Sequence, residues 1–146
     1  MKRIFLILLA VVLLNQSVGC SAAENIIASK PQKTDYVKAY YFHGDFRCSN
    51  CYKIEKYSKE AIDKYFAKEL ASGELEYKVI NVDERGNEHF AVDYKLYTKS
   101  LVISKIKDGR EVEYKNLEKV WDHLGNKGTF YNYVKEEIEN FLKDNK

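Results

Sequence analysis

Apolar and polar positions follow one another in the order of an α/β domain. Residues 37–42 form a largely apolar run of β-forming side chains, which is typical of a central strand buried on both faces. Apolar side chains then recur at helical spacing from Ile54 to Leu70, and Gly73 is placed to end this predicted helix. Residues 75–82 predict a second strand, and because a helix connects the two strands, we expect them to be parallel.

The second half of the chain predicts an antiparallel hairpin between short helices. Asp108-Gly109 separates two runs of β-forming residues and favours a tight hairpin turn. Asn87 is placed to cap a short helix, and Gly125 is placed to stop another. The predicted elements are a short helix over 87–94, strands over 101–106 and 111–114, a short helix over 117–124 and a last helix over 130–142.

The N-terminus has the composition of an export signal. Basic Lys2-Arg3 precedes the apolar run 4–14, which is too short to anchor the chain across a bilayer, so residues 1–22 predict a cleaved signal peptide. Alternatively, residues 1–19 are a lipoprotein signal and Cys20 is lipidated, which would give the protein its only contact with a membrane. Residues 23–35 predict a flexible tether, and residues 36–146 the folded domain.

The charge balance excludes one class of partner. Lys and Arg number 24 against 22 Asp and Glu, and Lys2 and Arg3 belong to the export segment, so the remaining chain carries 22 charges of each sign. This neutrality argues against electrostatic binding of nucleic acid, which requires a basic surface. The length suits a single hydrophobic core.

Cys48 and Cys51 lie three residues apart where the first strand gives way to the long helix. Unpaired N–H groups at a helix N-terminus stabilise a thiolate and lower its pKa. Cys48 would then be the attacking sulfur and Cys51, one turn inside, the resolving sulfur of a Cys48–Cys51 disulfide. Two other interpretations stay open, an inert structural disulfide and a metal site with His43 as a third ligand.

The order of elements around this pair resembles the thioredoxin-like superfamily over residues 36–143. The local sequence from Tyr41 to Glu55 is similar to a narrower group, the nitrophenyl compound nitroreductase subunit ArsF family. The resemblance implies an α/β, thioredoxin-like fold with a mixed central sheet, and an extra short helix before the C-terminal helix. It also implies a thiol:disulfide oxidoreductase without a bound cofactor, which acts on protein thiols or disulfides and receives electrons from a DsbD-like membrane donor.

Two departures from thioredoxins affect the neighbourhood of the dithiol. The loop that carries a cis-proline in thioredoxins has Lys99 here, and because a non-proline cis bond is costly, we expect Lys99 to be trans. The position of the buried thioredoxin aspartate is Phe42, so a carboxylate that assists proton transfer would have to be Asp45 or Glu55.

Two further residues are candidates for a supporting role. His43 precedes the dithiol and could stabilise a thiolate or shuttle a proton, or it could simply bind backbone in a loop. Arg47 could lower the pKa of the adjacent Cys48 by its charge, or its side chain could point into solvent.

A second hypothesis comes from a different class, a non-catalytic thioredoxin-like adaptor or accessory subunit with a structural disulfide. The two hypotheses differ in one structural expectation. A redox protein should expose Cys48 beside a shallow apolar groove, whereas an inert disulfide can be buried.

Overall fold

A computed structural model describes residues 33–143. The predicted signal peptide, Cys20 and most of the predicted tether lie outside the described residues, as do the last three residues.

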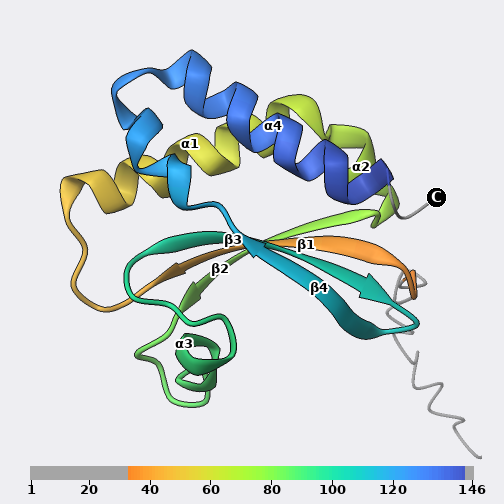
Figure 1. The fold of residues 1–146 in the computed structure, drawn as a ribbon, viewed down its shortest axis with the longest axis horizontal. Coiled ribbons are helices and arrows are strands. Elements are labelled where there is room, and N and C mark those ends of the chain that lie inside the picture. Colours follow the sequence, from red (N-terminus) through yellow and green to blue (C-terminus); the bar gives the residue numbers. More distant parts are fainter. Residues whose placement is uncertain (1–32, 144–146) are drawn as a thin grey trace, which may run out of the picture. The chain divides into compact units, whose positions relative to one another are not determined.

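The described residues form a four-stranded sheet with the strand order β2-β1-β3-β4 (Figure 1). The central strand β1 (Tyr36–His43) pairs in parallel with β2 (Leu75–Asn81). On its other side β1 pairs antiparallel with β3 (Ser100–Lys107), which pairs antiparallel with β4 (Arg110–Asn116). The parallel pair and the hairpin that the sequence predicts are therefore confirmed.

Side chains of β1 alternate between two apolar clusters because successive residues of a strand point to opposite faces. Val37, Ala39 and Tyr41 belong to the larger cluster, which also contains residues of the two long helices. Tyr40 and Phe42 belong to the smaller cluster on the other face, where their rings stack at 5.2 Å between centroids. The predicted burial of this strand on both faces is confirmed.

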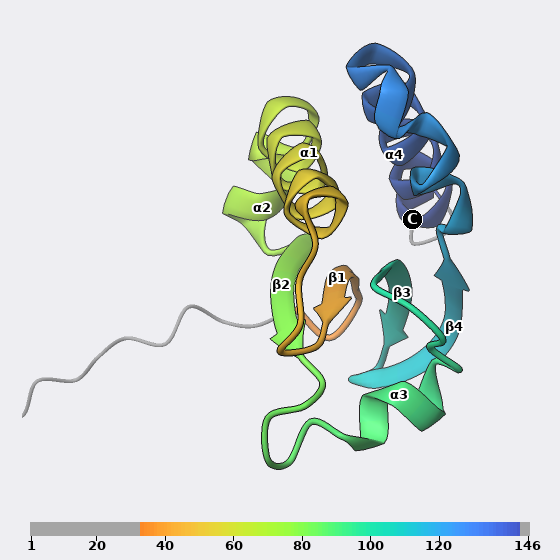
Figure 2. The same cartoon turned by 90° about the vertical axis from the view of Figure 1, so that its left-hand side faces the viewer.

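Helices lie on both faces of the sheet, as Figures 1 and 2 show. One face carries α1 (Ser49–Tyr65), α2 (Ala67–Ser72) and α4 (Lys127–Lys143), and the other carries α3 (His89–Asp93). The larger cluster is filled mainly from the two long helices and the sheet, by Ile54, Ala61, Ile62, Leu75, Leu101, Ile103, Phe130, Val134 and Ile138.

The prediction of a single long helix from Ile54 to Leu70 is wrong, because the structure has two helices, α1 and α2, over this range. Phe66 stands between them with φ −127° and ψ 28°, outside the helical region, and its side chain is buried in the larger cluster. Burial of this ring thus ends α1 although the apolar spacing continues. Gly73 ends α2 in the left-handed conformation, with φ 77°, as predicted.

Two smaller predictions need correction. Asn87 does not cap α3, since its side chain donates a hydrogen bond to the carbonyl of Asn81, and the helix begins after Glu88 without a side-chain cap. The short helix over 117–124 consists of two 3₁₀ turns, Glu118–Val120 and Asp122–Gly125. Both are too short for the apolar spacing to distinguish 3₁₀ from α geometry.

The hairpin turn lies at the predicted residues. Asp108 and Gly109 have φ values of 51° and 73°, and two successive positive values belong to a type I′ turn, whose twist matches that of paired strands. The predicted α/β architecture is confirmed as well: this mixed sheet, with helices on both faces and short 3₁₀ turns before α4, is a thioredoxin-like fold. Among residues 33–143, no helix is both long and apolar enough to cross a membrane.

Candidate functional site

Cys48 is the N-cap of α1, with extended φ and ψ of −87° and 169°. The backbone N–H of Cys51 donates to Cys48 Sγ at 3.3 Å, and the N–H of Cys48 donates to Cys51 Sγ at 3.1 Å. This is the arrangement of a capping box, in which Cys48 takes the place of the usual Ser or Thr at the N-cap and Cys51 takes the place of the usual Glu three residues later. Both residues are thiols here, and the predicted disulfide between them stays a prediction.

The two thiols differ in exposure and in acidity. Cys48 is exposed, whereas Cys51 is 1% exposed. Hydrogen bonds donated by the Cys51 thiol and by backbone N–H groups of the first turn lower the pKa of Cys48. Burial raises the pKa of Cys51, as does its hydrogen bond to the Cys48 thiol, and the backbone N–H of Cys48 and the positive charge of Lys99 oppose this rise only in part. Cys48 is therefore the thiol that is both accessible and ionised more readily.

Tyr41 anchors the first turn of α1 to the sheet. Its hydroxyl donates to the carbonyl of Cys51 at 2.7 Å, and its ring is fully buried. Tyr41 is not among the candidate site residues that the sequence predicts. The period of two in β1 is a signal that could have found it, because it places Tyr41 on the same face as Val37 and Ala39, towards α1.

Arg47 and Glu55 form an ion pair beside the dithiol, in which Arg47 Nη2 donates to Glu55 Oε2. The Arg47 side chain is only 15% exposed, so it does not point into solvent. Glu55 lies one helical turn after Cys51, as the sequence predicts, and its carboxylate is paired with the guanidinium of Arg47.

Asp45 is held at the end of β2. Its side chain accepts a hydrogen bond from Asn81 Nδ2 at 2.7 Å, and its N–H donates to Asp83 Oδ2 at 2.8 Å. Asn81 in turn accepts from the N–H of Asp83. These bonds fix the loop between β1 and α1. Of the two candidate carboxylates, Asp45 therefore anchors this loop, whereas Glu55 lies on α1, the helix that the dithiol begins.

Gly44 lies where this loop passes Asp83. A Cβ added at Gly44 would lie 2.5 Å from Asp83 Oδ2, which is closer than nonbonded atoms approach. Gly44→Ala would therefore displace the carboxylate from the N–H of Asp45, and because both groups are exposed to water, loss of this bond costs about 0.5–1.5 kcal/mol. We expect the free energy of unfolding, measured in urea, to fall by about that amount.

Gly125→Ala is the matched control for Gly44→Ala, because nothing lies within 4 Å of a Cβ at Gly125. Its free energy of unfolding should stay close to that of the wild type. If Asp83 is the obstacle, Asp83→Ala should make Gly44→Ala less costly. An equal loss in both backgrounds would contradict this account of the loop.

His43 ends β1, and its Nδ1 lies 2.9 Å from the carbonyl oxygen of Gly44. A carbonyl oxygen only accepts hydrogen bonds, so this bond requires the proton on Nδ1. This contact agrees with the interpretation of His43 as a loop histidine bound to backbone. In the part of the chain that the structure describes, no three His, Cys, Asp or Glu side chains are grouped to hold a metal ion, and this includes the proposed set of Cys48, Cys51 and His43.

Lys99 lies in the loop before β3, and all peptide bonds from 33 to 143 are trans, as predicted for Lys99. The indole N–H of Trp121 donates to the Lys99 carbonyl at 3.1 Å, so the 3₁₀ turns fix this loop. Lys99 Nζ lies 6.0 Å from the centre of the Phe46 ring, which brings the loop close to the segment before Cys48.

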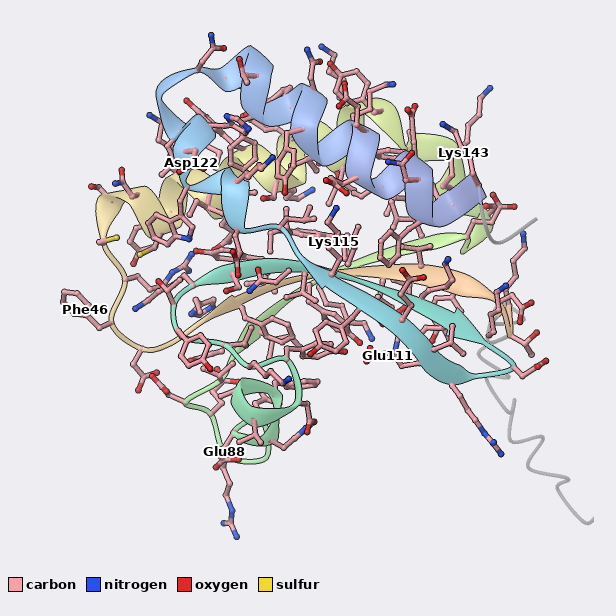
Figure 3. All side chains as sticks on the ribbon, viewed as in Figure 1. Phe46, Glu88, Glu111, Lys115, Asp122 and Lys143 are labelled. Atoms are coloured by element: carbon pink, nitrogen blue, oxygen red, sulfur yellow. The ribbon has the colours of Figure 1, made fainter. Side chains whose placement is uncertain are left out.

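Exposed aromatic rings and a small pocket lie on these two loops. Phe46 is 80% exposed and points away from the domain in Figure 3, and Tyr97 is 96% exposed. A pocket of about 190 Å³ adjoins the second loop, lined by Tyr97, Thr98, Ser100, Asn116, Leu117, Glu118, Val120 and Trp121. The exposed Cys48 thus meets the first part of the expectation for a redox protein, and this pocket is the candidate for the predicted groove.

A larger pocket, of about 730 Å³, lies away from the dithiol. Its lining includes Thr34 and Asp35, before β1, and Tyr65 and Phe66, at the end of α1. The dithiol follows the other end of β1 and begins α1. This pocket therefore plays no part in dithiol chemistry.

Several solved structures of thioredoxins are similar to this chain. Thioredoxin from Fasciola hepatica matches with a TM-score of 0.42 and 20% identity, over 76% of this chain and 82% of that one. Thioredoxin O2 from Arabidopsis thaliana matches with a TM-score of 0.40 and 15% identity, over 66% and 76%. Thioredoxin from Trypanosoma brucei brucei gives 0.39 and 13%, over 72% and 77%. No family model and no curated protein sequence matches the chain.

Proposed function

We propose that this protein is a thiol:disulfide oxidoreductase in which Cys48 attacks and Cys51 resolves. One observation carries the proposal: the exposed thiol caps a helix and has a lowered pKa, while its partner one turn inside is buried with a raised pKa. Thiolates are the nucleophiles of disulfide exchange, so this asymmetry assigns the order of attack.

The exchange proceeds in two displacements. The Cys48 thiolate attacks one sulfur of a partner disulfide, forms a mixed disulfide and releases the second partner sulfur as a thiolate, which takes up a proton. Cys51 then loses its proton and attacks Cys48 Sγ, which releases the first partner sulfur. The partner gains two electrons and two protons, and the protein is left with a Cys48–Cys51 disulfide. A reductant of the dithiol class must then restore the two thiols.

The proposed substrates are protein thiols and disulfides, because Cys48 is exposed and the exposed rings of Phe46 and Tyr52, near it in the chain, offer apolar contacts to a partner's chain. The proposed site of action is the cell envelope, on the strength of residues 1–22 alone, with Cys20 as the proposed lipid anchor. In that oxidising compartment, a reductase of this kind needs electrons from across the membrane. A DsbD-like donor is therefore the proposed source, in keeping with the resemblance to the ArsF family.

The reduction potential of the Cys48–Cys51 pair tests the proposal against the adaptor hypothesis. The pair is equilibrated in glutathione or dithiothreitol buffers of known potential, and its thiols are counted by alkylation and mass spectrometry. Redox-active pairs lie at about −120 to −270 mV, and inert structural disulfides below about −300 mV. We expect a value above −300 mV. A lower value would favour the adaptor with a structural disulfide.

A further inference from the structure

The side chain of Arg47 is held by three side chains beside the dithiol. Its guanidinium pairs with Glu55, and its Cζ lies 4.2 Å from the centre of the Tyr52 ring and 5.8 Å from that of Tyr41. Tyr41 comes from β1, whereas Tyr52 and Glu55 come from the first two turns of α1. We call Arg47, Glu55, Tyr41 and Tyr52 the arginine clamp.

The clamp contains a polar atom that stability alone does not explain. Arg47 Nε is buried and has no hydrogen-bond partner among the described residues, and the same holds for the hydroxyl of Tyr77. Burial raises the pKa of Tyr77, and the negative charge of Glu55 raises it further. Buried polar groups without partners are unfavourable, and a buried ion pair is often no more stable than apolar side chains of the same size. Sites that depart from these rules are frequently functional.

The position of the clamp in the chain links it to the nucleophile. Arg47 directly precedes Cys48, whose extended backbone must place Sγ over the first N–H groups of α1. Tyr41 also holds the carbonyl of Cys51, so the clamp restrains both sides of the capping arrangement. Fixing Arg47 therefore fixes the residue that determines where the Cys48 sulfur lies.

We propose that the arginine clamp positions the dithiol, and that it makes Cys48 reactive by holding its sulfur over the first turn of α1 and not by the charge of Arg47. The proposal deepens the proposed function, on which it rests for its biological meaning. Glu55 neutralises the guanidinium locally. The groups that lower the pKa of Cys48 are, foremost, the Cys51 thiol and the backbone N–H groups of the turn.

Glu55→Gln and Arg47→Met together separate positioning from charge, because the two mechanisms predict opposite shifts in the pKa of Cys48 for Glu55→Gln. If the charge of Arg47 acts on Cys48, Glu55→Gln unmasks that charge and should lower the pKa of Cys48, whereas Arg47→Met should raise it. If the clamp acts by position, both variants loosen the cap and both should raise it. Arg47→Lys adds a third comparison, because lysine keeps the charge but lacks the planar fork that stacks and pairs.

The measurement is the rate of alkylation of the reduced full-length protein from pH 5 to 10, with the label assigned to Cys48 by peptide mass spectrometry. We expect Glu55→Gln, Arg47→Met and Arg47→Lys each to slow alkylation at neutral pH by about fivefold, the effect of losing one hydrogen bond to the thiolate. The midpoint of each pH profile should move upwards. Circular dichroism checks that each variant is folded.

The exposed pair of Lys59 and Asp63 on the same helix provides the matched control. Lys59→Met and Asp63→Asn should leave the pH profile of Cys48 unchanged. A lowered or unchanged midpoint in Glu55→Gln, or a wild-type profile in Arg47→Lys, would overturn the proposal. Alkylation requires no exchange with a partner, so a failure here is distinguishable from a reduction potential that contradicts the proposed function.

Discussion

Cys48→Ser is expected to abolish disulfide exchange, with a loss of at least about a thousandfold in the rate with a small aromatic disulfide and with insulin. Serine keeps the shape of the N-cap and is itself a preferred cap, so the fold should remain. It removes the one cysteine sulfur that is exposed among residues 33–143. Cys51 cannot replace it as the attacking group, since it is 1% exposed and its pKa is raised by burial.

The control for this experiment is Ser49→Ala, a change at the exposed residue that begins α1. It leaves both sulfurs in place and should retain exchange with both substrates. Appreciable exchange by Cys48→Ser would assign the attack to Cys51. The same conclusion would follow if a limiting amount of alkylating reagent labelled Cys51 before Cys48 in the reduced wild-type protein.

The lowered pKa of Cys48 also has a consequence for redox equilibrium. A thiol whose pKa falls on folding stabilises the folded, reduced protein above the unfolded pKa, and this contribution is lost as the pH falls through the folded pKa. The disulfide form has no such thiolate. Stabilising the thiolate therefore favours the reduced protein and makes the pair more oxidising, and the arginine clamp would contribute to this effect through the position of Sγ.

The main features of the fold could be predicted because they follow from local patterns. Burial of β1 on both faces and the hairpin turn at Asp108-Gly109 each have a signal within a few residues, and the parallel pairing with β2 follows from the helix that connects the two strands. The break at Phe66 has no such signal. Apolar spacing is the same for one bent helix as for two, and it is the tertiary burial of that ring that ends α1.

The site could be predicted only as far as neighbours in sequence determine it. Cys48 as the N-cap and Cys51 one turn inside follow from spacing. The bond from Tyr41 to Cys51 depends on how β1 is placed under α1, and the pairing of Asp45 with Asn81 depends on where β2 ends. From the sequence, Asp45 and Glu55 are therefore equal candidates for a carboxylate that assists proton transfer. In the structure, Asp45 anchors the loop before α1 and Glu55 pairs with Arg47.

Cys51→Ser is expected to stop the reaction halfway, with Cys48 held in a mixed disulfide with the partner. The first displacement needs only Cys48, and serine still offers a hydroxyl that can donate a hydrogen bond to the Cys48 sulfur in place of the thiol. The second displacement loses its nucleophile. An intramolecular thiol has a very high effective concentration, so free thiols in solution replace it poorly and we expect multiple turnover to fall by at least about a hundredfold.

Nonreducing gels and intact mass spectrometry measure this outcome, since the trapped species carries one partner molecule for each protein molecule. The double variant Cys48→Ser, Cys51→Ser should trap nothing, which shows that the adduct forms through Cys48. Cys51→Ala offers a further comparison, because alanine cannot donate to the Cys48 sulfur and should raise the pKa of Cys48 relative to Cys51→Ser. Wild-type turnover in Cys51→Ser would contradict the resolving role, because Cys48 would then complete the exchange without an intramolecular partner.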